Sequence, residues 1–179
     1  LMLAFTTAAT TWTQPALVDA VSSATPLALI GSGSTAQLPS LVDMLLGKHM
    51  GCLGETCSIA LLIGGAYLLI RRVISWHTPV AFLGSLFVLT ALLGQQPVYQ
   101  VLSGGAILGA FFMATDYATT PSTNSGRIIF GIGCGVLTAI IRVYGNYPEG
   151  VSFSILLMNI AAPYISRLTR HKPLGGIEA

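Results

Sequence analysis

The segment Arg127–Val143, RIIFGIGCGVLTAIIRV, has the composition of a helix inside a lipid bilayer. It is almost as long as the roughly 20 apolar residues that cross about 30 Å of hydrocarbon. The rest of the chain is similar, since 53% of its 179 residues are hydrophobic and 8% are charged, with a mean hydropathy of +0.77. Soluble domains carry about 25% charged residues. The sequence therefore predicts an all-α, polytopic integral membrane protein.

One partial and five full membrane spans are expected. They cover about 1–11, 54–70, 79–94, 101–116, 127–143 and 150–166, and many of the 20 glycines lie inside them, which suits close helix packing in lipid. The chain starts at Leu1 with a short apolar run and no charged region before it, which is not typical of a signal peptide. We expect a truncated helix over 1–11, a loop over 12–53, five transmembrane helices over 54–166 and a tail over 167–179, as a piece of a longer protein.

The basic residues predict an orientation. If the 12–53 loop lies on one side of the membrane, the opposite side holds six of the eight lysines and arginines, counting Arg127. The positive-inside rule makes that opposite side cytoplasmic. The 12–53 loop then faces outward and the C-terminal tail is cytoplasmic. A net charge of +2 without a basic stripe argues against nucleic acid as a partner.

The 12–53 loop contains Ser22-Ser23-Ala24-Thr25-Pro26, a run of small residues that ends in one hydroxyl before a proline. Further along, Pro39 and Ser40 could open a short amphipathic helix over Leu41–Leu46 at the membrane surface. Taken alone, these residues are also compatible with a connector rich in turn formers.

A second polar loop joins the expected spans 101–116 and 127–143. Asp116 ends the first of these helices and Arg127 starts the second, with seven hydroxyl-bearing residues between Thr115 and Ser125, Thr120 among them. In a purely structural interpretation, Asp116 and Arg127 form an ion pair, and Thr115 or Ser125 caps a helix end. In a functional interpretation, Asp116 and Arg127 line a cation path or the edge of a flavin. The negative charge of an aspartate near a helix C-terminus interacts unfavourably with the helix dipole, which is a mild indication that Asp116 has a functional role.

Other polar residues give weaker signals. His49, Cys52 and Cys57 could bind a metal, form a disulfide between the cysteines or simply pack, but their spacing matches no standard zinc site. Cys134 is expected to pack within a span. Arg142 is expected to reach the outer interface, towards Glu149, and Asn159 could bridge helices. The sequence has no Ser–His–Asp set, P-loop or paired carboxylates, which argues against hydrolysis and phosphoryl transfer.

Four blocks in order resemble one known family. They are SSATP at 22–26, SGGAILGAFFMATD at 103–116, NSGRIIFG at 124–131 and YPEGVSF at 147–153. They are similar to the C-terminal half of RnfD (RsxD), the D subunit of the Rnf ion-translocating electron-transport complex. That protein is homologous to the B subunit of the sodium-pumping NADH:quinone reductase. The resemblance runs along nearly the whole chain.

The resemblance implies a fold and a cofactor. It implies one half of a protein built from two similar five-helix repeats, with flavin mononucleotide (FMN) attached through a phosphoester to Thr25. In the matching signature, Ser22 and Ala24 stand beside that threonine. The implied protein is a subunit that relays electrons between ferredoxin and NAD within a complex that translocates Na⁺ or H⁺, and it is not catalytic alone. Its implied partners are the other Rnf subunits and the lipid bilayer, in the bacterial cytoplasmic membrane.

The resemblance also implies a riboflavin in the membrane part of the full-length protein. From another functional class, a urea-type channel or transporter without a redox cofactor also fits the glycine-rich helices and the Asp116–Arg127 loop. A purely structural membrane scaffold fits the composition but leaves the order of the motifs unexplained. Only the flavin interpretation accounts for the Ser-x-Ala-Thr signature.

Overall fold

A computed structural model describes residues 26–31, 38–47, 54, 57–145 and 150–169. All the elements in these ranges are helical, as the sequence predicts. In chain order they are α2 (Pro26–Gly31), α3 (Leu41–Leu46), α4 (Ser58–Ile70), α5 (His77–Leu92), α6 (Pro97–Leu102), α7 (Ala106–Leu108), the π-helical turn η2 (Gly109–Met113), α8 (Asn124–Tyr144) and α9 (Val151–Leu168).

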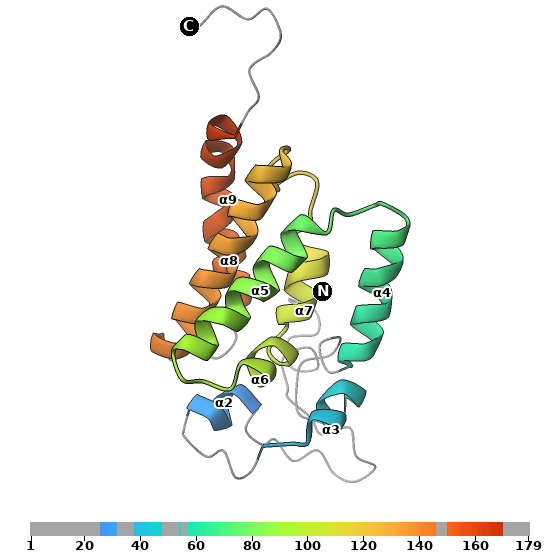
Figure 1. The fold of residues 1–179 in the computed structure, drawn as a ribbon, viewed down its shortest axis with the longest axis vertical. Coiled ribbons are helices and arrows are strands. Elements are labelled where there is room, and N and C mark those ends of the chain that lie inside the picture. The colour runs from blue at the N-terminus through green and yellow to red at the C-terminus, as the bar shows by residue number, and fades with distance from the viewer. Residues whose placement is uncertain (1–25, 32–37, 48–53, 55–56, 146–149, 170–179) are drawn as a thin grey trace, which may run out of the picture.

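The longest helix, α8, lies between α5 and α9 and contacts both (Figure 1). The short helices α2, α3 and α6 gather at one end of the bundle, which we call the α6 end. The α4–α5 connection, the start of α8 and the end of α9 lie at the opposite end. That end carries Arg71, Arg72, Arg127 and Arg167, and we call it the arginine end.

Glycines allow α5 and α8 to pack closely. A Cβ atom built on Gly131 would lie 2.7 Å from the backbone oxygen of Thr78, and one on Gly135 would lie 2.0 Å from Ser85 Oγ. Both distances are shorter than real carbon contacts allow, so the two helix backbones can approach this closely only because side chains are absent here. Small residues at helix interfaces are typical of membrane bundles.

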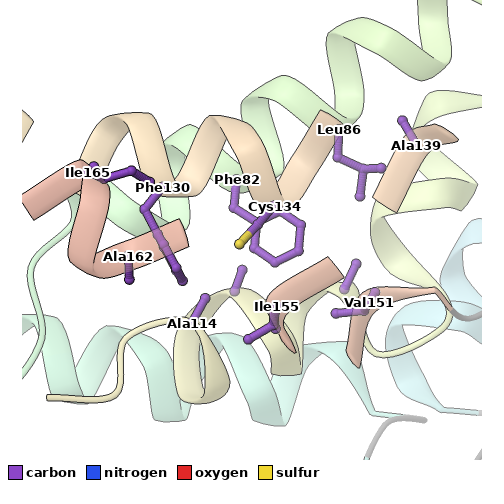
Figure 2. Packing of buried hydrophobic residues seen from close by; sticks show 12 residues of the cluster. Phe82, Leu86, Ala114, Phe130, Cys134, Ala139, Val151, Ile155, Ala162 and Ile165 are labelled. Atoms are coloured by element: carbon purple, nitrogen blue, oxygen red, sulfur yellow. The ribbon is translucent and has the colours of Figure 1, made fainter. Parts of the chain in front are cut away.

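A hydrophobic core runs along one face of α8. Figure 2 shows Phe82 of α5 and Cys134 of α8 in the middle of this core, with Ala114 and Ile155 nearby. Cys134 is fully buried, which confirms that it packs within the core. The faces turned away from the core are apolar as well, since α9 exposes Phe153 and Ile160, among others. Helices that are apolar all round suit a lipid environment.

Two of the described helices, α8 and α9, are long and apolar enough to cross a membrane. Both match expected spans, with ends that differ from the prediction by one to three residues. The helices α4 and α5 are apolar but shorter, with 13 and 16 residues. The five-helix repeat and the orientation in the membrane stay predictions.

The expected single helix over 101–116 is broken in the structure. Its first part begins earlier, at Pro97, and ends at Leu102. The chain then passes through extended Ser103 and two glycines with left-handed backbones, Gly104 at φ 63° and Gly105 at φ 67°, before it becomes helical again at α7. Glycine adopts this conformation at little cost, whereas other residues resist it. Apolar periodicity continues through the break, which is why hydropathy alone predicted one helix.

The short elements give mixed results. The predicted helix Leu41–Leu46 is confirmed as α3, with Ser40 as its N-cap accepting a hydrogen bond from the Asp43 amide at 3.2 Å. The sequence did not predict α2, which begins directly after Thr25. The expected helix 1–11 and the C-terminal tail beyond Thr169 lie outside the described residues.

Candidate functional site: a polar pocket and an arginine-anchored helix break

A pocket of about 660 Å³ opens at the arginine end of the bundle. Two segments that are distant in the sequence form it, namely the α4–α5 connection and the loop from η2 to α8. Its walls combine two arginines, one aspartate, two aromatic rings, several hydroxyls and a few aliphatic side chains. The lining residues are Leu69, Arg72, Val73, Ile74, Ser75, Trp76, Thr78, Thr115, Asp116, Tyr117, Thr120, Ser122 and Arg127.

The three residues predicted for this region are brought together. Asp116, Thr120 and Arg127 all line the pocket. The Thr120 amide donates to the Asp116 carbonyl at 3.1 Å, and its hydroxyl donates to the Ala114 carbonyl at 3.1 Å. These bonds fold the loop into a tight turn, so Asp116 and the start of α8 face the same space.

The ion pair considered for Asp116 and Arg127 does not form between these two described residues. Arg127 Nε donates instead to the Pro121 carbonyl at 3.2 Å, and one Asp116 carboxylate oxygen accepts from the Thr119 hydroxyl at 3.4 Å. The N-cap of α8 is also neither Thr115 nor Ser125. Thr123 takes that place and accepts from the Gly126 amide at 3.1 Å, because its extended backbone turns its hydroxyl onto the first helical turn.

The sequence did not predict the opposite wall of the pocket. Arg72 lies there with a left-handed backbone, at φ 54°, which costs a non-glycine residue about 1–2 kcal/mol. Tyr117 ties the two walls together, since its hydroxyl donates to the Val73 carbonyl. Trp76 lies at the same wall and stacks on His77 with ring centroids 4.3 Å apart. Positions some 40 residues apart meet here, so no local pattern could reveal them.

At the α6 end, Arg142 of α8 holds the broken helix. Its Nη2 donates to the carbonyls of Ser103 at 3.1 Å and Gly104 at 3.0 Å. Its Nη1 donates to the side-chain oxygen of Gln100 at 3.2 Å and also to the Gln100 carbonyl. A cation beside the last carbonyls of a helix is favoured by the helix dipole and satisfies carbonyls that lack an intrahelical partner. The expectation that Arg142 simply reaches the interface towards Glu149 missed this role, and Glu149 lies outside the described residues.

The helix α2 rests on the same junction. Leu27 is 5% exposed, and a Cβ built on Gly104 would lie 2.3 Å from Leu27 Cδ1 and 2.8 Å from Arg142 Nη2. Leu27 and the guanidinium therefore both lie against this glycine. Ser22, Ala24 and Thr25 lie outside the described residues, so the flavin attachment at Thr25 stays a prediction. The chain that follows Thr25 is nevertheless fixed at the end of the bundle opposite the pocket.

The remaining polar candidates do not form a site among the described residues. Cys57 is a half-buried free thiol whose sulfur lies 3.9 Å from the Leu45 carbonyl, while His49 and Cys52 are outside the description. No metal-binding group of three or more His, Cys, Asp or Glu residues is found within the described part of the chain. Asn159 does not bridge helices through its side-chain oxygen, which is buried without a partner in the described structure.

The described residues form a helical bundle with apolar outer faces and polar features at both ends, and two of its helices, α8 and α9, are long and apolar enough to cross a membrane. The chain belongs to the NQR2, RnfD, RnfE family, whose model matches residues 1–175. This confirms the family inferred from the four sequence blocks.

Similar proteins are named as D subunits of redox complexes. The chain is 51% identical over 161 residues to the D subunit of the Na⁺-translocating ferredoxin:NAD⁺ oxidoreductase complex of Acetobacterium woodii, with 89% of this chain and 51% of that protein covered. It is 40% identical over 192 residues to the D subunit of the proton-translocating ferredoxin:NAD⁺ oxidoreductase complex of Clostridium ljungdahlii, with 98% and 58% covered. It is 39% identical to the D subunit of the ion-translocating oxidoreductase complex of Pseudomonas paraeruginosa, with 88% and 48% covered. The chain spans about half the length of the curated relatives it matches.

Proposed function

We propose that this chain is the flavin-bearing part of the D subunit in an ion-translocating ferredoxin:NAD⁺ oxidoreductase complex. The single observation that carries this proposal is the match to the family over residues 1–175, together with relatives named as the D subunits of such complexes. The protein relays electrons within the complex, which couples their flow to Na⁺ or H⁺ transport. It is not catalytic alone, because the electron donor and acceptor act through the other subunits.

The proposed cofactor is FMN, held by a phosphoester to the Thr25 hydroxyl. The bound flavin supplies the electron-transfer chemistry, and the protein binds and orients it. Ser22 and Ala24 are small, so they leave room beside the threonine for the phosphate and the ring. Pro26 and Leu27, the two residues after Thr25, are buried at the start of α2, which supports a firmly anchored attachment segment. A riboflavin elsewhere in the full-length protein is part of the same proposal.

We also propose a multi-pass location in the bacterial cytoplasmic membrane, with Thr25 outside and the C-terminus in the cytoplasm. In support, four of the five arginines that the structure describes lie at the arginine end, and the helix after Thr25 lies at the α6 end. The positive-inside rule then assigns the arginine end to the cytoplasm. In this arrangement, Asp116, Thr120 and Arg127 line a pocket on the cytoplasmic side, which we propose as an ion path or as the place of a flavin edge. A flavin at this pocket would not be the one on Thr25, because the chain after Thr25 lies at the other end of the bundle.

A second candidate function is a urea-type channel or transporter without a redox cofactor. The observation that favours it is the helix break at Ser103–Gly105, because transport proteins commonly bind substrates where membrane helices are discontinuous. Against it, the carbonyls of Ser103 and Gly104 and the side-chain oxygen of Gln100 already accept from Arg142.

The experiment that separates the two functions is in-gel flavin fluorescence. The full-length protein is expressed together with a flavin transferase, denatured and separated by electrophoresis. We expect a fluorescent band for the wild type and for Ser23→Ala, which changes the variable position of the signature, and a dark band for Thr25→Ala. A dark wild-type band, with the transferase shown to be active on another substrate, would contradict the redox proposal and leave the channel as the better interpretation.

A further inference from the structure

The pocket at the arginine end has the chemistry of a phosphate-binding site. Arg72 and Arg127 reach it from two different segments, and Asp116 is the one carboxylate among the residues that line it. Its charge is therefore net positive. Arginine is suited to phosphate because its planar guanidinium can donate two parallel hydrogen bonds to two oxygens. The lining also includes the hydroxyls of Ser75, Ser122 and several threonines.

The position of Arg72 is a second, independent sign of a ligand. It is the non-glycine residue with a positive φ among the described ranges, and its neighbour Arg71 has an ordinary helical backbone. Strained backbones persist where the surrounding structure fixes them, and they cluster at ligand-binding positions. Arg71 and Arg167 lie at the same end of the bundle and are exposed, as Arg72 is, but they do not line the pocket.

The surroundings indicate that the ligand is an amphiphile. The pocket lies at the ends of the apolar helices α4, α5 and α8, where a bundle of this kind meets the lipid headgroups. Trp76 and Tyr117 stand at the pocket and are 59% and 75% exposed. Exposed tryptophan and tyrosine are enriched at the interface between membrane and water. Basic pockets between helices on the cytoplasmic side are known to bind acidic lipid headgroups.

We propose that this pocket binds the headgroup of a phospholipid with a single phosphodiester and free hydroxyls, such as phosphatidylglycerol. Arg72 and Arg127 contact the phosphate oxygens from opposite walls. Asp116 accepts a hydrogen bond from a headgroup hydroxyl and disfavours a second phosphate through repulsion. The acyl chains then lie along the apolar faces of α4 and α5. This inference does not rest on the flavin at Thr25, which is assigned to the other end of the bundle.

The test is lipid binding by the full-length protein in detergent and in nanodiscs. Spin-labelled phosphatidylglycerol and phosphatidylcholine are compared as probes, and inorganic phosphate and glycerol phosphate are added as competitors. We expect the wild type to prefer phosphatidylglycerol. Removal of one arginine from the pocket, as in Arg72→Gln or Arg127→Gln, should lower that preference by about five- to tenfold.

Two kinds of control keep this test decisive. Arg71→Gln and Arg167→Gln remove the same charge from the same end of the bundle but outside the pocket. The preference of these variants for phosphatidylglycerol over phosphatidylcholine should stay within about twofold of the wild-type preference. Arg72→Gly removes the guanidinium while relieving the strained backbone, so it should bind as weakly as Arg72→Gln without loss of fold.

Two results would overturn the proposal. An equal loss in all four glutamine variants would show a diffuse surface charge effect rather than a pocket. Full competition by inorganic phosphate or glycerol phosphate, at concentrations that match the lipid, would show that the pocket binds a soluble phosphate compound instead of a lipid.

Discussion

Replacing Arg142 with methionine should destabilise the protein more than replacing any exposed arginine does. The guanidinium makes four hydrogen bonds across the helix break, to the Gln100 carbonyl, to the Gln100 side chain, and to the Ser103 and Gly104 carbonyls. Methionine matches the unbranched stem of arginine and fits an apolar helix, but it lacks the guanidinium and can donate none of these bonds. The carbonyls at the end of α6 would then lose their partner within the bundle.

The magnitude follows from the burial of this site. A hydrogen bond to a charged group contributes about 1.5–3 kcal/mol, and disrupting a buried charged network costs about 3–5 kcal/mol. Because Arg142 is half-buried, water can replace some of its bonds, so the losses do not simply add. We expect the free energy of unfolding to fall by about 3 kcal/mol, or by up to roughly 5 kcal/mol if water is kept out.

The assay is thermal unfolding of the purified full-length protein in detergent, monitored by circular dichroism. Arg142→Lys keeps one charge that can reach only some of the acceptors, so its stability should fall between that of the wild type and that of Arg142→Met. Arg167→Met changes an exposed arginine and should alter the stability by less than about 0.5 kcal/mol. If the free energy of unfolding of Arg142→Met lies within about 1 kcal/mol of the wild-type value, the anchoring role assigned to this arginine is refuted.

Two further predictions concern α8. Gly135→Ala should destabilise the protein by about 1–3 kcal/mol, because its Cβ would lie 2.0 Å from Ser85 Oγ and 2.5 Å from a backbone oxygen. The control is Gly84→Ala in α5, which should be neutral or slightly stabilising because a Cβ there would have no atom within 4 Å. The comparison of their melting temperatures checks this, and equal values would contradict close α5–α8 packing. Thr123→Ala should cost about 1 kcal/mol through loss of the N-cap of α8, while Thr123→Ser keeps the accepting hydroxyl and should stay near the wild type in the same assay.

Much of the helical layout could be predicted from the sequence because it depends on local properties. The membrane class follows from composition, and α8 and α9 follow from long apolar runs. The helix Leu41–Leu46 follows from a serine that caps an apolar segment. The break at Ser103–Gly105 was missed because hydropathy continues across it, although the two consecutive glycines were a signal that could have suggested it.

Only one side of the pocket could be predicted from the sequence. Asp116 and Thr120 lie in the loop before α8 and Arg127 lies in the first turn of that helix, so their proximity followed from a short sequence separation, and all three line the pocket. Arg72 and Trp76 complete the pocket from another loop, and nothing in either loop encodes this meeting.

The sequence by itself determined the family, the helical class and the long apolar helices α8 and α9, because these depend on residue types and on neighbours along the chain. Only the tertiary structure decided that Arg142 anchors the broken helix and that Arg72 and Arg127 line the same pocket. The physical reason is that both arrangements join segments about 40 or more residues apart. Their geometry is set by how closely α5, α8 and α9 pack, and that depends on the shapes of all their contacting side chains at once.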